Sequence, residues 1–380
     1  MKIYDYLNMS SLFYALNGGL VTQRNHPRWP LAILNYTTKA MGKTHDNDTL
    51  RKCRGLIYDV ETFEIVARPI QAFFNVNDER YPETSIERLQ TLFHSAVSHH
   101  DVCLEITEKM DGSMGIIYQY KDNPPEVATR GSFTSEQAVW ATLFVQSYDY
   151  VKPPLYTPIV EIIYPGNQIV VDYGDRKALV LIAMIETETG AELTHRAQPF
   201  RLPPAPLTVV PLYNKSPAQC ALENFRNREG YVFKFFVPDK TIPLRFKAKF
   251  EDYRLAHRAM FGMNTRDVWE LMKAGTLDWS VFDSATDGFK KWLRDQVTTL
   301  QDEFEHCKQL VEMLVDDVQH VGIDRDTTRK EVAEFLKSRA GNLFSACFAC
   351  YDGKDYQAAI WKTLRPARAV SYKEVKPEVE

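Results

Sequence analysis

The chain has 380 residues and a formal net charge of −4, with 44% hydrophobic and 25% charged residues. These values are ordinary for a folded globular protein and exclude a disordered or fibrous chain, and the negative net charge argues against a protein that coats nucleic acid by bulk electrostatics. The segment Met1–Leu12 contains no continuous apolar run, and eighteen consecutive apolar residues occur nowhere. We therefore expect no secretion and no membrane insertion, and a cytoplasmic location, in the host if the source is a virus.

Short runs of β-branched and aromatic residues between turn residues dominate from about residue 54 to residue 250. Few connections are long enough for crossover helices, so we expect a mixed, largely antiparallel β architecture. The expected strands are Leu56–Tyr58, Cys103–Thr107, Met114–Tyr120, Ile159–Tyr164, Gln168–Tyr173, Leu179–Ile185, Tyr231–Phe236 and Leu244–Phe250.

After about Tyr253 the pattern becomes helical. Apolar residues from Phe289 to Val318 recur at alternating spacings of four and three, which places them on one stripe of a long helix. Further helices are expected at Arg266–Ala274, Arg329–Arg339 and Asp355–Thr363, with Gly275 and Gly341 as stops. A dimerising coiled coil is the alternative for the long stripe, but its four heptads with polar interruptions favour packing within the chain and a monomer.

These patterns predict an α+β protein of two domains, since the chain exceeds the size at which one core stops growing. The β-rich domain is expected at residues 1–255 and an all-helical domain at residues 256–380.

The first chemical motif is Glu108-Lys109-Met110-Asp111-Gly112-Ser113, between two expected strands. A lysine in such a turn is held near a pocket by sheet on both sides. The Lys-x-Asp-Gly pattern alone arises by chance in roughly one chain in ten of this length. A hairpin turn with a solvent-exposed lysine is the alternative.

The second motif, Arg245-Phe246-Lys247-Ala248-Lys249, places three cations on one face of a strand. Like charges so arranged cost stability unless an anion lies opposite, and a polyphosphate would be such an anion. An exposed edge strand that resists aggregation is the alternative.

Two carboxylates, Glu161 and Glu229, stand within or beside apolar runs. Unpaired burial of a carboxylate is costly, so each needs a partner such as a ribose hydroxyl or a hydrated metal, unless it faces solvent on the open side of the sheet.

Together these residues resemble the covalent nucleotidyltransferases, and specifically the ATP-dependent RNA ligase family of the T-even bacteriophage tRNA-repair type. The resemblance covers most of the chain up to Tyr253, and its elements keep the order and spacing of the family. The matching elements are Lys52-Cys53-Arg54-Gly55-Leu56-Ile57, Arg68-Pro69-Ile70-Gln71-Ala72-Phe73-Phe74-Asn75, Lys109–Ser113, Arg130-Gly131-Ser132 with Ser135–Ala138, Glu161 with Pro165, Asn167, Ile169 and Val170, Glu229-Gly230-Tyr231-Val232, and Phe246–Lys249.

The resemblance implies a nucleotidyltransferase fold for the β-rich domain and roles for individual residues. Lys109 would be the nucleophile that becomes adenylated, and Lys247 and Lys249 would act on the α-phosphate. Glu161 would contact the nucleoside sugar, and Glu229 would help to hold Mg²⁺ or Mn²⁺. The other residues expected to contact ATP are Arg54, Glu108, Asp111, Gly112 and Arg130.

One departure concerns the β- and γ-phosphates. Ala72 stands where the family typically has lysine, so Lys52, Arg68 or Lys39 would have to supply that charge. Arg130 also replaces a lysine but keeps its charge.

The implied activity is ATP-dependent joining of RNA 5′-phosphate and 3′-hydroxyl ends through lysyl-AMP, in the repair of single-stranded RNA or tRNA. For this chemistry the pKa of Lys109 must fall from about 10.4, and Lys247, Lys249 and Mg²⁺ are expected to lower it. The helical domain would take part in substrate choice. The alternatives are a DNA ligase or a capping guanylyltransferase, which usually carry a small β-barrel after the last motif, and a non-catalytic RNA-binding repair protein.

Overall fold

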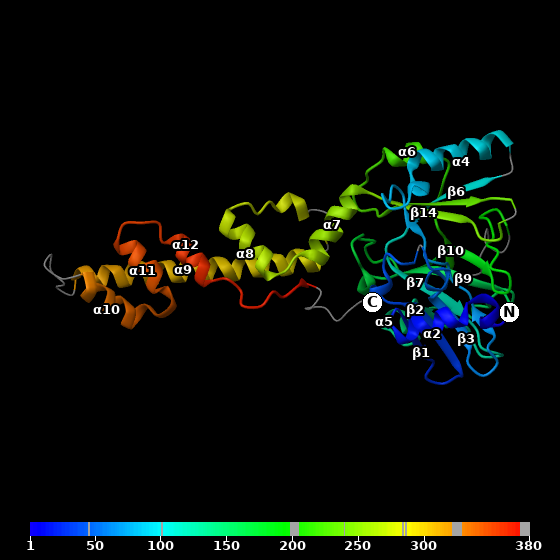
Figure 1. Ribbon diagram of the computed structural model, residues 1–380, viewed down its shortest axis with the longest axis horizontal. Helices are drawn as coiled ribbons and strands as arrows, with labels where there is room; N and C mark the ends of the chain where they lie inside the picture. Colours follow the sequence, from blue (N-terminus) through cyan, green and yellow to red (C-terminus); the bar gives the residue numbers. More distant parts are fainter. Residues whose placement is uncertain are drawn as a thin grey trace. The chain divides into compact units, whose positions relative to one another are not determined.

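The computed structural model describes residues 1–44, 46–99, 102–197, 205–238, 240–282, 285, 287–320 and 329–372. The chain divides into two compact units, residues 1–254 and residues 255–379. The first unit contains the β-sheets and the second contains helices (Figure 1).

The first sheet is antiparallel and comes from the N-terminal part of the chain. Its order is β1 (Val21–Asn25), β2 (Leu31–Tyr36), β3 (Arg54–Asp59) and β4 (Ile65–Ala67). A core of Ile3, Leu12, Leu34 and Leu56 joins it to the N-terminal helices. The helices of this region are α1 (Ile3–Tyr6), α2 (Met9–Asn17) and α3 (Asp48–Lys52).

The second sheet has the order β11 (Leu207–Val209), β10 (Ala178–Glu186), β9 (Tyr156–Ile163), β7 (Ser113–Tyr118) and β8 (Glu126–Thr129). Neighbouring strands are antiparallel except β10 and β11. Helix α5 (Glu136–Gln146) packs on this sheet through a core that joins Ala141 and Val145 to Val160 and Ile162.

The third sheet carries the lysine motifs. Its order is β12 (Leu212–Tyr213), β6 (Cys103–Lys109), β13 (Gly230–Phe236), β14 (Leu244–Lys249) and β5 (Phe74–Asn75), and β14 and β5 are its parallel pair. Helices α4 (Ile86–His99) and α6 (Pro217–Ala221) contact one another beside it, and α7 (Glu251–Gly262) begins directly after β14 (Figure 1).

The second unit consists of helices α8 (Thr265–Ala274), α9 (Asp287–His320), α10 (Arg329–Ala340), α11 (Phe344–Tyr351) and α12 (Gln357–Thr363). The stripe of α9 packs within the chain, because Val311 and Val318 share a core with Val332 and Leu336 of α10. Gly275 ends α8 in the left-handed conformation, with a φ of 63°. No helix in the described ranges combines the length and the apolarity that crossing a membrane requires.

The α+β fold class is confirmed, with antiparallel-rich sheets and a helical C-terminal part. One expected strand, Gln168–Tyr173, is wrong. Its apolar run looks like a strand, but the backbone N–H groups of Val170 and Val171 donate to the Asp111 carboxylate at 2.8 Å each instead of to a neighbouring strand. The segment is therefore a loop that wraps around Asp111.

Candidate active site

The pairing of three strands brings Lys109, Glu229 and Lys249 together. Strand β13 lies between β6 and β14, and its first residue, Gly230, faces Lys109 on one side and Lys249 on the other. Glu229 directly precedes Gly230, so its carboxylate lies between the two lysines. Lys109 Nζ donates to Glu229 Oε2 at 2.7 Å, and Lys249 Nζ lies 2.9 Å from Oε1. The site is thus a buried carboxylate flanked by two ammonium groups.

Only glycine fits at position 230. Its φ is 149°, and a Cβ there would lie 1.9 Å from the carbonyl oxygen of Ala248. This close approach of β13 to β14 brings Glu229 within reach of Lys249.

The three cations of β14 have different surroundings. Arg245 pairs with the buried carboxylate of Glu192, and Lys249 pairs with Glu229. Lys247 makes no ion pair within the described part of the chain, and its Nζ lies 5.1 Å from the centre of the Phe73 ring. Two protein carboxylates therefore neutralise two of the three charges for which the sequence suggested a polyphosphate, and no carboxylate of the described residues pairs with Lys247.

Burial is the largest cause that lowers the pKa of Lys247, to about 7, and the nearby charges of Lys109 and Arg54 lower it further. Lys109 behaves differently. Burial lowers the pKa of Lys109, but the carboxylates of Glu229 and Glu161 outweigh burial and raise it above its ordinary value. The protein's own groups therefore raise the pKa of Lys109 and do not lower it as expected from Lys247 and Lys249, and the expected lowering by Mg²⁺ stays a prediction.

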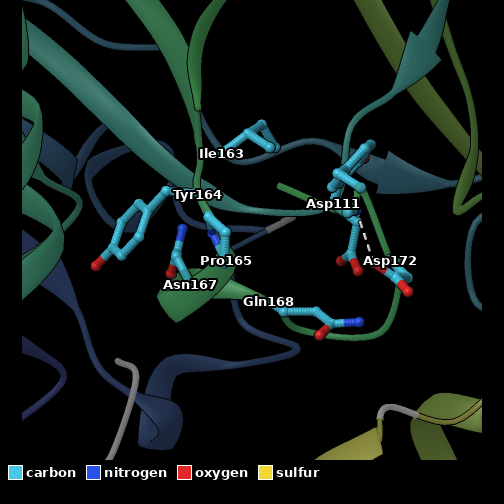
Figure 2. A pocket seen from close by; sticks show the side chains of 9 residues that line it. Asp111, Ile163, Tyr164, Pro165, Asn167, Gln168 and Asp172 are labelled. Atoms are coloured by element: carbon cyan, nitrogen blue, oxygen red, sulfur yellow. Dashed lines mark hydrogen bonds between the residues drawn. The ribbon is translucent and has the colours of Figure 1, made fainter. Parts of the chain in front are cut away.

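Asp111 braces the turn that follows Lys109. Its Oδ1 accepts a hydrogen bond from the Tyr253 hydroxyl at 2.7 Å, and its Oδ2 accepts from two backbone N–H groups of the loop after β9. Figure 2 shows the Asp111 side chain pointing from its turn toward the loop of Gln168 and Asp172. Both oxygens have donors inside the protein, which favours a positioning role over the ATP contact expected for Asp111.

A small pocket that Asp111 helps to line lies beside these hydrogen bonds (Figure 2). Among the described residues that line it there is no lysine or arginine, so it lacks the charge of a phosphate site. The lining residues are Asp111, Ile163, Tyr164, Pro165, Asn167, Gln168, Asp172, Tyr173 and Gly174.

Glu161 of β9 contacts Gly112, which directly precedes β7. The Gly112 backbone N–H donates to Glu161 Oε1 at 3.1 Å. Burial raises the pKa of Glu161 to about 7; Lys109 opposes the shift, and Glu229 and Asp111 add to it. Glu161 therefore has a partner in the chain and is electrostatically coupled to the lysine and carboxylate cluster.

Glu108 does not join this cluster. Its carboxylate pairs with Arg228 at 3.2 Å and accepts a hydrogen bond from Tyr213. Neighbouring side chains of a strand point to opposite faces, so Glu108 lies behind the sheet while Lys109 lies in front. The structure therefore gives no side-chain contact between Glu108 and the other expected site residues.

The remaining expected cations, Arg54 and Arg130, lie against aromatic rings. The Arg54 guanidinium lies 5.6 Å from the ring centre of Phe73, the ring that Lys247 also approaches. Arg130 lies 5.4 Å from the ring centre of Tyr36.

Two of the three residues considered as substitutes for a lysine at position 72 are already engaged. Lys52 Nζ lies 2.6 Å from Asp48, and Arg68 is buried and donates to the Glu188 carbonyl. Lys39 is exposed in a 3-10 turn at Thr38–Ala40.

Sequence reasoning missed Tyr253 and Glu192. No motif marks either residue, because Tyr253 acts through its position in the first turn of α7, and Glu192 follows β10 by six residues.

The sequence model of a family described as RNA ligase matches residues 52–255, more than half of the chain. The matched range contains every expected site residue from Arg54 to Lys249, and also Tyr253.

Three similar proteins illustrate the match. A Thermovibrio ammonificans protein named as a candidate RNA ligase is 27% identical over 230 residues, which are 57% of this chain and 56% of that protein. A candidate bifunctional polynucleotide kinase/RNA ligase of Autographa californica nuclear polyhedrosis virus is 24% identical over 253 residues, 62% of this chain and 34% of that protein. An archaeal ATP-dependent RNA ligase structure aligns over 89% of both chains, with 15% identity and a TM-score of 0.46. The chain thus spans about half or less of the length of the curated relatives.

Proposed function

Because the chain belongs to the RNA ligase family, we propose that it uses ATP to join 5′-phosphate and 3′-hydroxyl ends of RNA through AMP bound covalently to Lys109. The observation that carries the proposal is the cluster in which Lys109, Lys249 and Glu229 meet, with Lys247 beside them. One end of the sheet then carries three functions: Lys109 as the nucleophile, Lys247 and Lys249 as cations for a phosphate, and Glu229 as a carboxylate for a metal.

In the first step the Lys109 nitrogen forms a bond to the α-phosphorus of ATP, and the bond to the bridging oxygen of the β-phosphate breaks, so that pyrophosphate leaves. Lys109 must first lose its proton to solvent, because Glu229, to whose Oε2 the Lys109 Nζ donates, favours the ammonium form. Lys247 and Lys249 stabilise the charge that grows on the α-phosphate oxygens. AMP then passes to the RNA 5′-phosphate, and a 3′-hydroxyl displaces AMP as the strand is sealed.

The donor set fits a divalent cation shared with ATP. No cluster of three or more His, Cys, Asp or Glu side chains suited to a metal occurs in the described ranges, but Mg²⁺ commonly takes one or two carboxylates together with substrate phosphates. Glu229 would hold it, with Glu161 nearby. The ion would supply positive charge that weakens the hold of Glu229 on the Lys109 ammonium and so favours the neutral amine.

The helical unit favours this function over the two related ones. The described residues after β14 form helices α7 to α12, where a DNA ligase or a capping enzyme would usually carry a small β-barrel. In residues 356–372 there are three Lys/Arg and no Asp/Glu, a charge balance suited to an RNA backbone. We assign substrate choice, including tRNA, to this unit.

The experiment that tests the function incubates the full chain with ATP and a 5′-phosphorylated single-stranded RNA. Circular RNA is expected, with less product from the matched DNA strand or from GTP. Equal sealing of nicked duplex DNA would assign the chain to DNA ligation instead.

A further inference from the structure

A second ion pair lies directly behind the candidate active site. Lys109 and Glu229 form the ion pair in front of the sheet, here the front pair. The residues that precede them, Glu108 and Arg228, pair with each other behind the sheet and form the rear pair. Arg228 Nε and Nη2 donate to Glu108 Oε1 and Oε2 at 3.3 and 3.2 Å, as a two-pronged contact.

Aromatic side chains hold this rear pair in place. The Tyr213 hydroxyl donates to Glu108 Oε2 at 2.7 Å and accepts from Arg228 Nη2. The Arg228 guanidinium lies 5.3, 5.1 and 5.7 Å from the ring centres of Tyr213, Phe225 and Tyr231. Arg228 is therefore tied to β12, β6 and β13 at once.

The front pair and the rear pair have opposite polarity. In the front pair the cation, Lys109, comes from β6, and the anion, Glu229, directly precedes β13. In the rear pair the anion, Glu108, comes from β6, and the cation, Arg228, comes from the segment before β13. The proposed reaction requires Glu229 to release the Lys109 ammonium, and this removes the attraction that joins the two chain segments in front. Glu108 and Arg228 pair on the opposite face of the sheet from Lys109 and Glu229, so we expect their pair to persist through that change.

We propose that Arg228 and Glu108 are positioning residues for nucleotidyl transfer. They keep the end of β6 and the start of β13 at the spacing that aligns Lys109 and Glu229 while the front pair is open. This inference rests on the proposed function, and it replaces the ATP contact expected for Glu108.

The same face of the sheet offers a matched control. Lys215 Nζ lies 2.7 and 2.9 Å from the two carboxylate oxygens of Glu223, with side-chain exposures of 28% and 24% against 25% and 15% for Arg228 and Glu108. The Lys215–Glu223 pair touches Tyr231 and shares the rings of Tyr213 and Phe225 with Arg228, but neither of its residues is next to Lys109 or Glu229 in the sequence. Loss of this pair should affect stability alone.

The test measures protein–AMP formation from α-labelled ATP in the full chain, over ranges of Mg²⁺ and ATP, beside the Tm of each variant. Glu108→Gln is expected to lower the maximal rate about tenfold and to raise the Mg²⁺ needed for half the maximal rate, because small misplacements of reacting groups cost one to two orders of magnitude. Arg228→Gln should behave alike, and the double variant should lose little more than either single one, as expected of residues that act as a unit. Glu223→Gln should keep both kinetic values. If Glu108→Gln does not fold, Arg228→Lys, which keeps the charge without the two-pronged contact, takes its place.

Wild-type kinetics in Glu108→Gln, or an equal loss in Glu223→Gln, would overturn the positioning role and leave the proposed function intact. Absence of any adduct in the wild-type protein would overturn both.

Discussion

The Tyr253 hydroxyl donates a hydrogen bond of 2.7 Å to Oδ1 of Asp111, and so links the first turn of α7 to the turn that follows Lys109. Both side chains are buried, and the other Asp111 oxygen is held by the loop after β9. The turn that carries the candidate nucleophile is therefore braced from two directions.

Removal of this hydroxyl leaves a buried carboxylate oxygen without its donor. Tyr253→Phe should lower the free energy of unfolding by about 1–3 kcal/mol and slow adduct formation, since an unsatisfied buried acceptor carries that cost. The control is Tyr150→Phe, because the buried Tyr150 hydroxyl has no hydrogen-bond partner among the described residues. Urea unfolding of both variants measures the difference, and equal stabilities would show that the bond is dispensable.

Gly230 permits the close approach of β13 to β14. Gly230→Ala should destabilise the protein severely, because the added Cβ would lie 1.9 Å from the Ala248 carbonyl oxygen. Gly174→Ala is the matched control, since Gly174 has a φ of +61° and nothing within 4 Å of an added Cβ. That variant should lose only about 1–2 kcal/mol, the cost of a left-handed alanine. Thermal unfolding separates them, and similar Tm values would contradict the tight approach.

Nucleotide binding should depend on pH through Lys247. Its pKa of about 7 means that Lys247 carries its charge below pH 7 and loses it above. Phosphate binding favours the charged form, so ATP affinity should fall above pH 7, by at most about tenfold per pH unit. Lys247→Arg keeps its charge and should flatten this dependence. Calorimetric titration at pH 6 and pH 8.5 tests the sign, and tighter binding at pH 8.5 would refute it.

Glu229 should control the metal requirement. Glu229→Ala is expected to raise the Mg²⁺ concentration needed for adduct formation. The partly buried Lys109 and Lys249 also lose their shared buried anion, which costs less than the about 3–5 kcal/mol of breaking a fully buried pair. A metal titration of the adduct rate, read beside the Tm, separates the two effects. An unchanged titration curve would count against a metal at Glu229.

Much of the fold follows from local pattern. The apolar stripe from Phe289 to Val318 predicted α9, because a long run of apolar residues at helical spacing indicates a helix from the local sequence alone. The apolar run at Gln168–Tyr173 predicted a strand that does not form, because two of its backbone N–H groups donate to Asp111, more than fifty residues earlier in the chain. Of the N-terminal sheet only β3 was expected, through Leu56–Tyr58, whereas β1, β2 and β4 were missed. Strand β2 is buried over Leu31–Leu34, so it lacks the alternation that marks a half-buried strand.

The sequence predicted which residues form the candidate site, but it did not predict most of the contacts between them. Motif order brought together Lys109, Glu229 and Lys249, and the structure places all three at one sheet end. Strand alternation would have set Glu108 behind the sheet, opposite Lys109. The partners Arg228 and Tyr253 come from distant segments, and only the tertiary structure reveals them.

The proposed function depends on AMP bound to Lys109. Purified wild-type protein and the Lys109→Ala variant are incubated with α-labelled ATP and Mg²⁺ and separated on a denaturing gel, with Lys330→Ala, at an exposed lysine of α10, as the control. We expect a labelled band in the wild-type and control lanes and none in the Lys109→Ala lane. A labelled band that persists in Lys109→Ala would contradict it.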